Sequence, residues 1–289
     1  MKIQRWLREN LDHGGSDLLA IRLYERAFIG TSPLNFVTPA ANLYWRLAPS
    51  YYRWKFGQNL RQYEYPPDPF KILWVCPDQI EKYTGRQFPP WEHREYHFGR
   101  VENGEWDRQD PRDNPKAAQS ASIADRFSNS VLYQSFKNHF RSGMPWEETE
   151  LYQRVRDRID NESYDWPTSE RDLRERYESL DALYEEIIKN GYMTQMDLRK
   201  QSDTVDPGFN NSGDPKGFLE RFSHEIAVDI GRDGELLFVD GRHRLAIAKV
   251  AEIPQVPIVV LVRHEKWMEN RNRAGRKKKV TSHPDLDDL

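Results

Sequence analysis

Residues 226–262 read IAVDIGRDGELLFVDGRHRLAIAKVAEIPQVPIVVLV, and this stretch decides the fold. Two β-type runs, at 226–230 and 236–239, flank a Gly-Arg-Asp-Gly turn and predict a hairpin. The apolar spacing then changes to that of a helix over 242–251. A continuous apolar run at 256–262 predicts a buried strand. The unit is therefore hairpin, helix and strand.

Polar chemistry is concentrated where the second strand of this unit meets the helix, at Asp240, Gly241, Arg242, His243 and Arg244. The first N–H groups of a helix have no partner within it and carry partial positive charge. Glycine lets a ligand approach the backbone, and arginine and histidine donate hydrogen bonds to phosphate oxygens. The junction is therefore a candidate phosphate site. The alternative is that Asp240 only caps the helix while Arg242 and Arg244 face water.

Two parts of the chain resemble the ParB/sulfiredoxin superfamily. Residues 179–195, SLDALYEEIIKNGYMTQ, are similar to the family's first box, which is the end of a helix followed by a glycine. Residues 237–249, LFVDGRHRLAIAK, are similar to its second box, a strand followed by DGxHRxxAxK. The run 253–260 fits a return strand, and residues 71–85 fit the family's opening strand and helix. Residues 86–167 then form a large insertion.

The resemblance implies an α+β fold in which helices surround a small mixed sheet. We expect residues 71–265 to form the ParB/sulfiredoxin-like domain, with a mostly helical insertion at 86–167. Residues 1–70 are expected to form a helical, aromatic-rich extension. The polar tail at 266–289 is expected to be disordered. Local patterns predict helices within 119–160 and over 169–190, and a hairpin turn at Asn103-Gly104.

Members of this superfamily use the second box to hold nucleotide phosphates: CTP in ParB proteins, and ATP in sulfiredoxin and in a free-serine kinase. The resemblance therefore implies a nucleotide-binding protein with ATP or CTP and Mg²⁺ as cofactors. Its enzymatic forms would be a phosphotransferase or a nucleotide hydrolase. Gly241, Arg242, His243 and Arg244 would bind the phosphates, and Asp240 and His243 would be catalytic. The alternative is a non-catalytic regulatory or DNA-interacting module on the same fold.

Two departures from the family pattern narrow these options. Sulfiredoxin chemistry requires a cysteine in the second box, where this chain has Arg242, and Cys76 is far away in sequence. ParB partition proteins require a helix-turn-helix domain after the box, and the residues after Val262 do not show that pattern. A phosphotransferase also needs a carboxylate, for which Asp240 is the first candidate and Glu225 and Asp229 are others. The alternative for the latter two is an outward-facing place on a strand.

Other residues suggest further chemistry. His93 and His97 have the spacing of metal ligands if their segment is helical, but no third ligand lies near them in sequence. A basic cluster could contact nucleic-acid phosphates, or could be a solvated tail: Arg271, Arg273, Arg276, Lys277, Lys278 and Lys279. The rings at residues 44–54 could stack on bases, but the default expectation is that they pack against the core.

Composition limits the class of protein. The chain has 289 residues, 12% aromatic residues and a net charge of −3. The aromatic content indicates a folded chain, and the small net charge means that an anionic ligand needs a local positive cluster. No apolar run approaches the length of a membrane span, and the N-terminus lacks an apolar signal segment. With Cys76 as the one cysteine, these features predict a cytoplasmic protein without integral membrane association.

Overall fold

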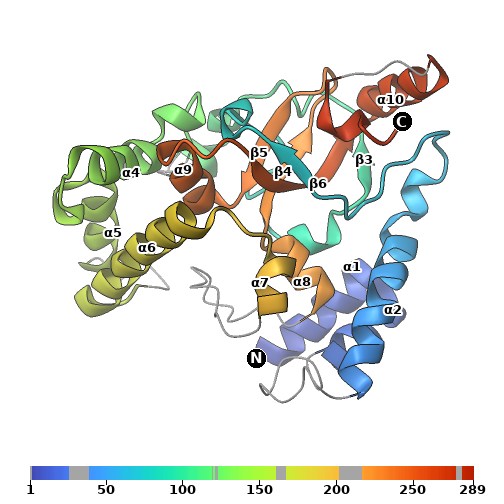
Figure 1. The fold of residues 1–289 in the computed structure, drawn as a ribbon, viewed down its shortest axis with the longest axis horizontal. Coiled ribbons are helices and arrows are strands. Elements are labelled where there is room, and N and C mark those ends of the chain that lie inside the picture. The colour runs from blue at the N-terminus through green and yellow to red at the C-terminus, as the bar shows by residue number, and fades with distance from the viewer. Residues whose placement is uncertain are drawn as a thin grey trace.

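The computed structural model describes residues 2–25, 39–118, 120, 123–160, 167–201, 217–277 and 282–289. Within these residues, helices surround one six-stranded mixed sheet, which confirms the expected α+β fold class (Figure 1). The strands are β1 (Leu73–Val75), β2 (Lys82–Tyr83), β3 (Arg100–Glu102), β4 (Ile226–Ile230), β5 (Leu236–Asp240) and β6 (Val256–His264). The helices are α1 (Lys2–Tyr24), α2 (Pro39–Phe56), α3 (Pro115–Ala118), α4 (Val131–Ser142), α5 (Glu150–Asp160), α6 (Glu170–Asn190), α7 (Gln195–Gln201), α8 (Phe218–Ser223), α9 (Arg242–Val250) and α10 (Glu265–Lys277).

The hairpin, helix and strand predicted from 226–262 form the centre of the sheet. Strands β4 and β5 pair antiparallel, α9 follows, and β6 returns parallel to β4. The order across the sheet is β1-β6-β4-β5-β2. All nine residues of β6 are buried, as expected for a strand that is covered on both faces.

One edge of β6 is shared by two short strands. Strand β1 pairs antiparallel with the start of β6, with Leu73 opposite Ile258. Strand β3 pairs parallel with its end, with Val101 opposite Arg263. Residues 86–167, expected to be a mostly helical insertion, therefore contribute a strand to the sheet as well as helices. The predicted opening strand is present, whereas the helix expected after it is only a 3₁₀ turn, Pro77–Gln79.

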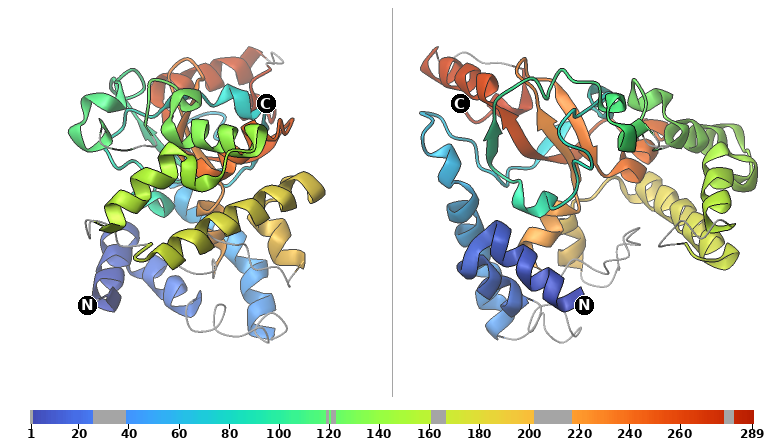
Figure 2. Two further views of the ribbon diagram at one scale, coloured as in Figure 1. Left: turned by 90° about the vertical axis from the view of Figure 1, so that its left-hand side faces the viewer. Right: turned by 180° about the vertical axis from the view of Figure 1, so that it is seen from behind.

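Each face of the sheet has its own apolar core, because side chains alternate between faces along a strand. On one face, Val228, Phe238 and Val260 pack with residues of α4, α5, α6 and α9. On the other face, Leu237 and Val259 pack with residues of α1, α2 and α8. Figures 1 and 2 show α4, α5 and α6 gathered on one side of the sheet, away from α1 and α2.

The N-terminal extension is helical and rich in aromatic residues, as predicted. Helix α1 has a kink at Gly15, where φ is 78°. Tyr44 and Tyr52 of α2 are buried, and both hydroxyls donate to Glu25, so these rings pack against the core. No helix in the described ranges is both long and apolar enough to cross a membrane.

The disordered tail predicted for 266–289 is wrong for the part that the structure describes. Residues 265–277 form α10, and Asp285 lies fully buried beyond it. Asp285 accepts hydrogen bonds from Arg263 at 2.6 Å and from Trp267 at 2.9 Å. Asp285 in this segment is therefore bound by residues of β6 and α10 instead of facing water.

The hairpin predicted at Asn103-Gly104 is also wrong. Gly104 does adopt a positive φ of 107°, but β3 pairs with β6 instead of with the residues that follow the turn. Asp107 is bound by Arg232, which donates to its carboxylate through the backbone N–H at 2.8 Å and through the side chain at 2.7 Å. This contact holds the chain in a turn where a second strand was expected.

Candidate functional site

The junction between β5 and α9 has the geometry of an anion site. Gly241 precedes α9 with φ 92°, a left-handed conformation that glycine adopts readily. A Cβ atom at this position would lie 2.9 Å from the Cα atom of Ile226, so the backbones approach closely. The N-cap residue is Gly241 rather than Asp240, and the positive end of the α9 dipole lies at this junction.

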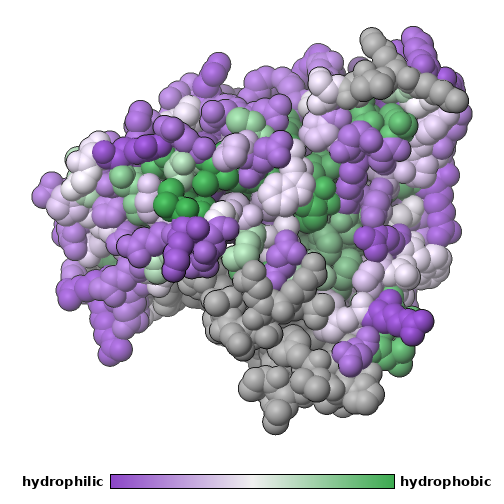
Figure 3. All heavy atoms as spheres, in the orientation of Figure 1, coloured by the Kyte–Doolittle hydropathy of each residue, from purple (hydrophilic) through white to green (hydrophobic). Residues whose placement is uncertain are grey.

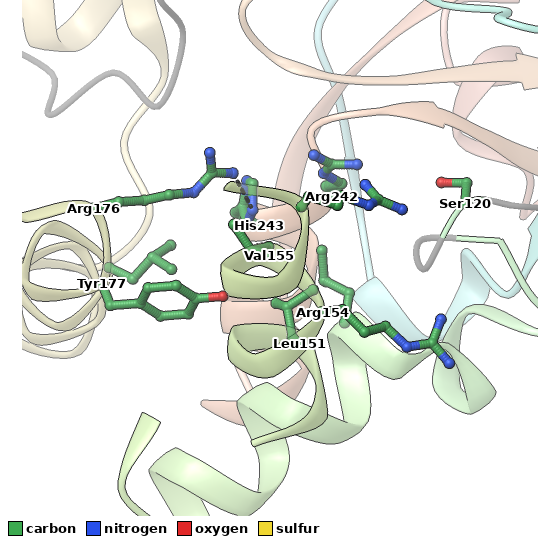
Figure 4. Close-up of a pocket in the computed structure, with 11 residues that line it drawn as sticks. Ser120, Leu151, Arg154, Val155, Arg176, Tyr177, Arg242 and His243 are labelled. Carbon is green, nitrogen blue, oxygen red and sulfur yellow. Dashed lines mark hydrogen bonds between the residues drawn. The ribbon is translucent and has the colours of Figure 1, made fainter. Parts of the chain in front are cut away.

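A basic cavity of about 40 Å³ lies beside this helix start. It is bounded by α5, α6 and α9, and its described lining residues include four arginines and a histidine but no carboxylate. These residues are Arg154, Arg158, Arg176, Arg242 and His243. Figure 4 shows Arg176 reaching from α6 toward His243, while Arg242 points toward Ser120. Pockets for complete small ligands are roughly 300–1,000 Å³, so this cavity is too small for a whole nucleotide. Its size suits a single group such as one phosphate.

His243 is buried inside this cluster of positive charge. Burial, and then the charges of Arg242, Arg176 and Arg244, lower the pKa of His243 well below its usual value. The ring is therefore neutral at pH 7, and its Nε2 atom lies 3.4 Å from Nη2 of Arg176. Since a guanidinium can only donate, Nε2 is the acceptor. A strongly lowered pKa weighs against proton transfer by His243 and favours a role in orienting Arg176.

Arg244 lies on a different side of α9 from Arg242. Its Nη1 atom is 4.0 Å from Oε2 of the buried Glu225, and it lines a groove with Tyr192 and Leu198 near the end of α6. Successive helix residues are rotated by about 100°, so positions two apart point in nearly opposite directions. The structure therefore brings Arg242 and His243 into one cavity and leaves Arg244 outside it. Figure 3 shows apolar side chains gathered between α9 and α6.

The candidate carboxylates all have structural partners. Asp240 forms an ion pair with Arg94, which precedes β3. Glu225 accepts a hydrogen bond from the backbone N–H of Gln195 at 2.6 Å. Asp229 binds Arg86 at 2.7 Å and is fully buried. The outward-facing positions considered for Glu225 and Asp229 are thus wrong, whereas the side chain of Asp240 remains 27% exposed.

The structure places the candidate metal ligands and the basic cluster in different settings. His93 and His97 flank a 3₁₀ turn, Arg94–Tyr96, and no metal-binding group of three or more His, Cys, Asp or Glu occurs among the described residues. Arg271 is buried and donates to the carbonyl of Tyr65 at 2.7 Å, so it is not a surface contact for nucleic acid. Arg273, Arg276 and Lys277 are exposed. Lys278 and Lys279 lie outside the described residues.

Cys76 adjoins the opposite end of α9 from the candidate site. Asp78, two residues after Cys76, lies 3.6 Å from Lys249 in the last turn of α9. The nearby Glu81 also pairs with Lys249. This placement agrees with the sequence argument against sulfiredoxin chemistry. That chemistry requires a cysteine at the start of the helix, where this chain has Arg242.

Arg94, Arg154, Arg158 and Arg176 were not anticipated as site residues. They come from the turn before β3, from α5 and from α6, and they reach the site only through tertiary packing. One sequence pattern involves two of them. Arg154 and Arg158 are four residues apart, and like charges at this spacing destabilise an isolated helix. Such a pair does not favour helix formation by itself, but Arg154 also pairs with Glu150 at 2.5 Å, so the spacing alone does not indicate a site.

Comparisons with known proteins leave the family open. No protein-family model matches this chain, and no solved structure matches it. Among curated proteins, a stretch of 120 residues is 27% identical to a proline–tRNA ligase of Prochlorococcus marinus subsp. pastoris. That stretch is 42% of this chain and spans only 18% of the ligase.

Proposed function

We infer that this protein binds a nucleoside triphosphate, with its phosphates at the start of α9. The observation that carries this proposal is the basic cavity between α5, α6 and α9, into which Arg176, Arg242 and His243 project. Cationic donors next to a helix N-terminus favour a phosphate group. The resemblance of residues 179–262 to the ParB/sulfiredoxin superfamily supports the same ligand class.

ATP and CTP, with Mg²⁺, are the nucleotides to test first. The cavity has room for a phosphate group, and the nucleoside would lie outside it on the adjoining surface. Magnesium usually keeps several waters and binds through one or two carboxylates and the phosphates themselves. Asp240, at the end of β5, is the carboxylate that would take part, and breaking its ion pair with Arg94 would release it.

Binding is tested by calorimetric titration with ATP, CTP and GTP, each with and without Mg²⁺. Arg242→Gln should weaken the affinity about tenfold or more, because it removes a charged donor from the cavity. Arg244→Gln should have a smaller effect, since Arg244 faces another groove. Arg171→Gln is the matched control, because Arg171 lies on α6 with its side chain 86% exposed. If none of the three nucleotides binds, the proposal is wrong.

A phosphotransferase or hydrolase is the enzymatic form of this proposal. Asp240→Asn should abolish turnover and keep nucleotide binding if the carboxylate acts in the reaction. Arg94→Gln breaks the same ion pair and leaves the carboxylate in place. Turnover lost in Asp240→Asn but kept in Arg94→Gln therefore assigns the reaction to Asp240. Loss in both variants would mean that the pair only maintains the structure.

The alternative is a non-catalytic regulatory module that contacts DNA. Its support in the described residues is the exposed part of the basic cluster, Arg273, Arg276 and Lys277. Arg276 is already paired with Glu64 at 2.6 Å, so the contact surface is small. Salt-dependent DNA binding that is lost in an Arg273→Gln, Lys277→Gln double variant, together with absent nucleotide turnover, would favour this alternative.

A further inference from the structure

A second cavity, of about 340 Å³, lies apart from the basic cavity at α9 and shares no lining residue with it. It is formed by the segment that follows β2, by β3 and by the turn around Trp106. Its volume is within the range of pockets that hold small organic ligands. Phe88, Pro89 and Pro90 supply an apolar wall, and Arg86, His97, Arg100 and Trp106 supply N–H donors.

Arg86 is fixed by protein contacts and determines the state of His97. Its guanidinium binds both oxygens of the buried Asp229, at 2.7 and 3.2 Å. It also lies 3.3 Å from Nδ1 of His97. Burial, and then the charges of Arg86 and Arg100, lower the pKa of His97 to about 3. The ring is therefore neutral, Nδ1 accepts from Arg86, and Nε2 carries the proton as a donor.

Two further donors of this cavity have no acceptor in the described part of the chain. The indole Nε1 of the buried Trp106 makes no hydrogen bond. The half-buried guanidinium of Arg100 has neither a hydrogen bond nor a salt bridge to a described residue, although the charge of Glu102 acts on it. A buried donor without an acceptor is costly, so such groups in native structures indicate a missing partner.

We propose that this cavity binds a small organic oxyanion, a carboxylate or a phosphate ester, through Arg100, Trp106 and His97. Arg100 and His97 can donate to the anion without giving up a protein partner. Nε1 of Trp106 has almost no accessible surface, so the indole must shift toward the cavity before it donates. The apolar wall at residues 88–90 would hold the organic part of the ligand. Two carboxylates also line the cavity. Glu92 is exposed and lies 3.8 Å from His93, and Glu102 adjoins Arg100 along β3, so the anion must lie on the side of Trp106 and His97.

The test uses benzoate, succinate, phenyl phosphate and inorganic phosphate as probes, with benzamide as the uncharged match of benzoate. Two-dimensional ¹H–¹⁵N NMR follows the indole N–H signal of Trp106, which Trp106→Phe identifies by its disappearance. We expect an anionic probe to shift this signal saturably, and benzamide not to do so. If benzoate or succinate shifts the signal, the ligand of this cavity is a carboxylate. If phenyl phosphate or inorganic phosphate shifts it, the ligand is a phosphate.

Arg100→Gln should weaken binding of the responding probe by about tenfold to a hundredfold, because it removes a charged donor. Arg108→Gln is the control, since Arg108 is exposed on the following turn and does not line the cavity. The proposal is overturned if no probe shifts the Trp106 signal, if benzamide shifts it as benzoate does, or if Arg100→Gln binds as tightly as the unaltered protein. The wild-type spectra decide the first two outcomes even if a variant fails to fold.

Discussion

Gly241 imposes the tightest local constraint at the candidate nucleotide site. Its φ of 92° is costly for any other residue, and an added Cβ would meet the backbone of Ile226 at 2.9 Å. We expect Gly241→Ala to lower the free energy of unfolding by about 1–3 kcal/mol, measured by urea denaturation. It should also weaken nucleotide binding, because the start of α9 must shift to relieve the contact.

Gly104→Ala is the control for this substitution. Gly104 also has a positive φ, of 107°, but a Cβ at that position would have no atom within 4 Å. It therefore carries the conformational cost without the collision. An equal loss of stability in the two variants would show that the close approach of Ile226 has no energetic consequence.

The neighbouring arginines show what a motif can and cannot predict. The rotation of about 100° per residue already separates Arg242 from Arg244 on any helix. The sequence therefore contained the reason why the two side chains do not share one cavity. It could not indicate Arg176 as a partner of His243, because their 3.4 Å contact depends on how α6 packs beside α9.

Among the strands and helices, local patterns predicted the 226–262 unit to within a residue or two of its observed bounds. Strand alternation and helix spacing are properties of short segments, so one sequence is enough to detect them. The pairing of β3 with β6 joins residues that are about 160 positions apart, as with Arg100 opposite Val262. A turn signal such as Asn103-Gly104 says nothing about such a distant partner, which is why the hairpin prediction failed.

The segment after α10 stabilises the fold through one buried ion pair. Arg263 and Asp285 are both almost completely buried, and their atoms lie 2.6 Å apart. Removing one partner of such a pair leaves an uncompensated buried charge. We expect Asp285→Asn to lower the free energy of unfolding by about 3–5 kcal/mol in urea denaturation.

Asp287→Asn provides the comparison two residues away. Asp287 pairs with Lys71, but its side chain is 62% exposed, and exposed pairs contribute only about 0–1 kcal/mol. If Asp285→Asn proved as mild as Asp287→Asn, the carboxyl-terminal segment would be attached to the surface without supporting the core.

In the described part of the fold, the pKa values of four histidines are lowered: His97 beside β3, His224 after α8, His243 in α9 and His283 in the carboxyl-terminal segment. Burial is the first cause in each case. It lowers the pKa of His224 to about 4, from an ordinary value of 6.5, and that of His97 to about 3. At His97 and His224 the unfolded chain therefore binds protons below about pH 6.5, whereas the folded chain does not until pH 3–4.

Stability should consequently fall as the pH decreases from about 6.5 toward 4, by at most about 1.4 kcal/mol per pH unit for each histidine. Glu25 opposes this trend, because burial raises its pKa. Urea denaturation across this window measures the slope. His224→Gln removes one titrating group and keeps a donor for the carbonyl of Glu220, which His224 contacts at 2.6 Å. Its slope should therefore be shallower. An unchanged slope would mean that His224 gains its proton without unfolding, and that the acid sensitivity has another source.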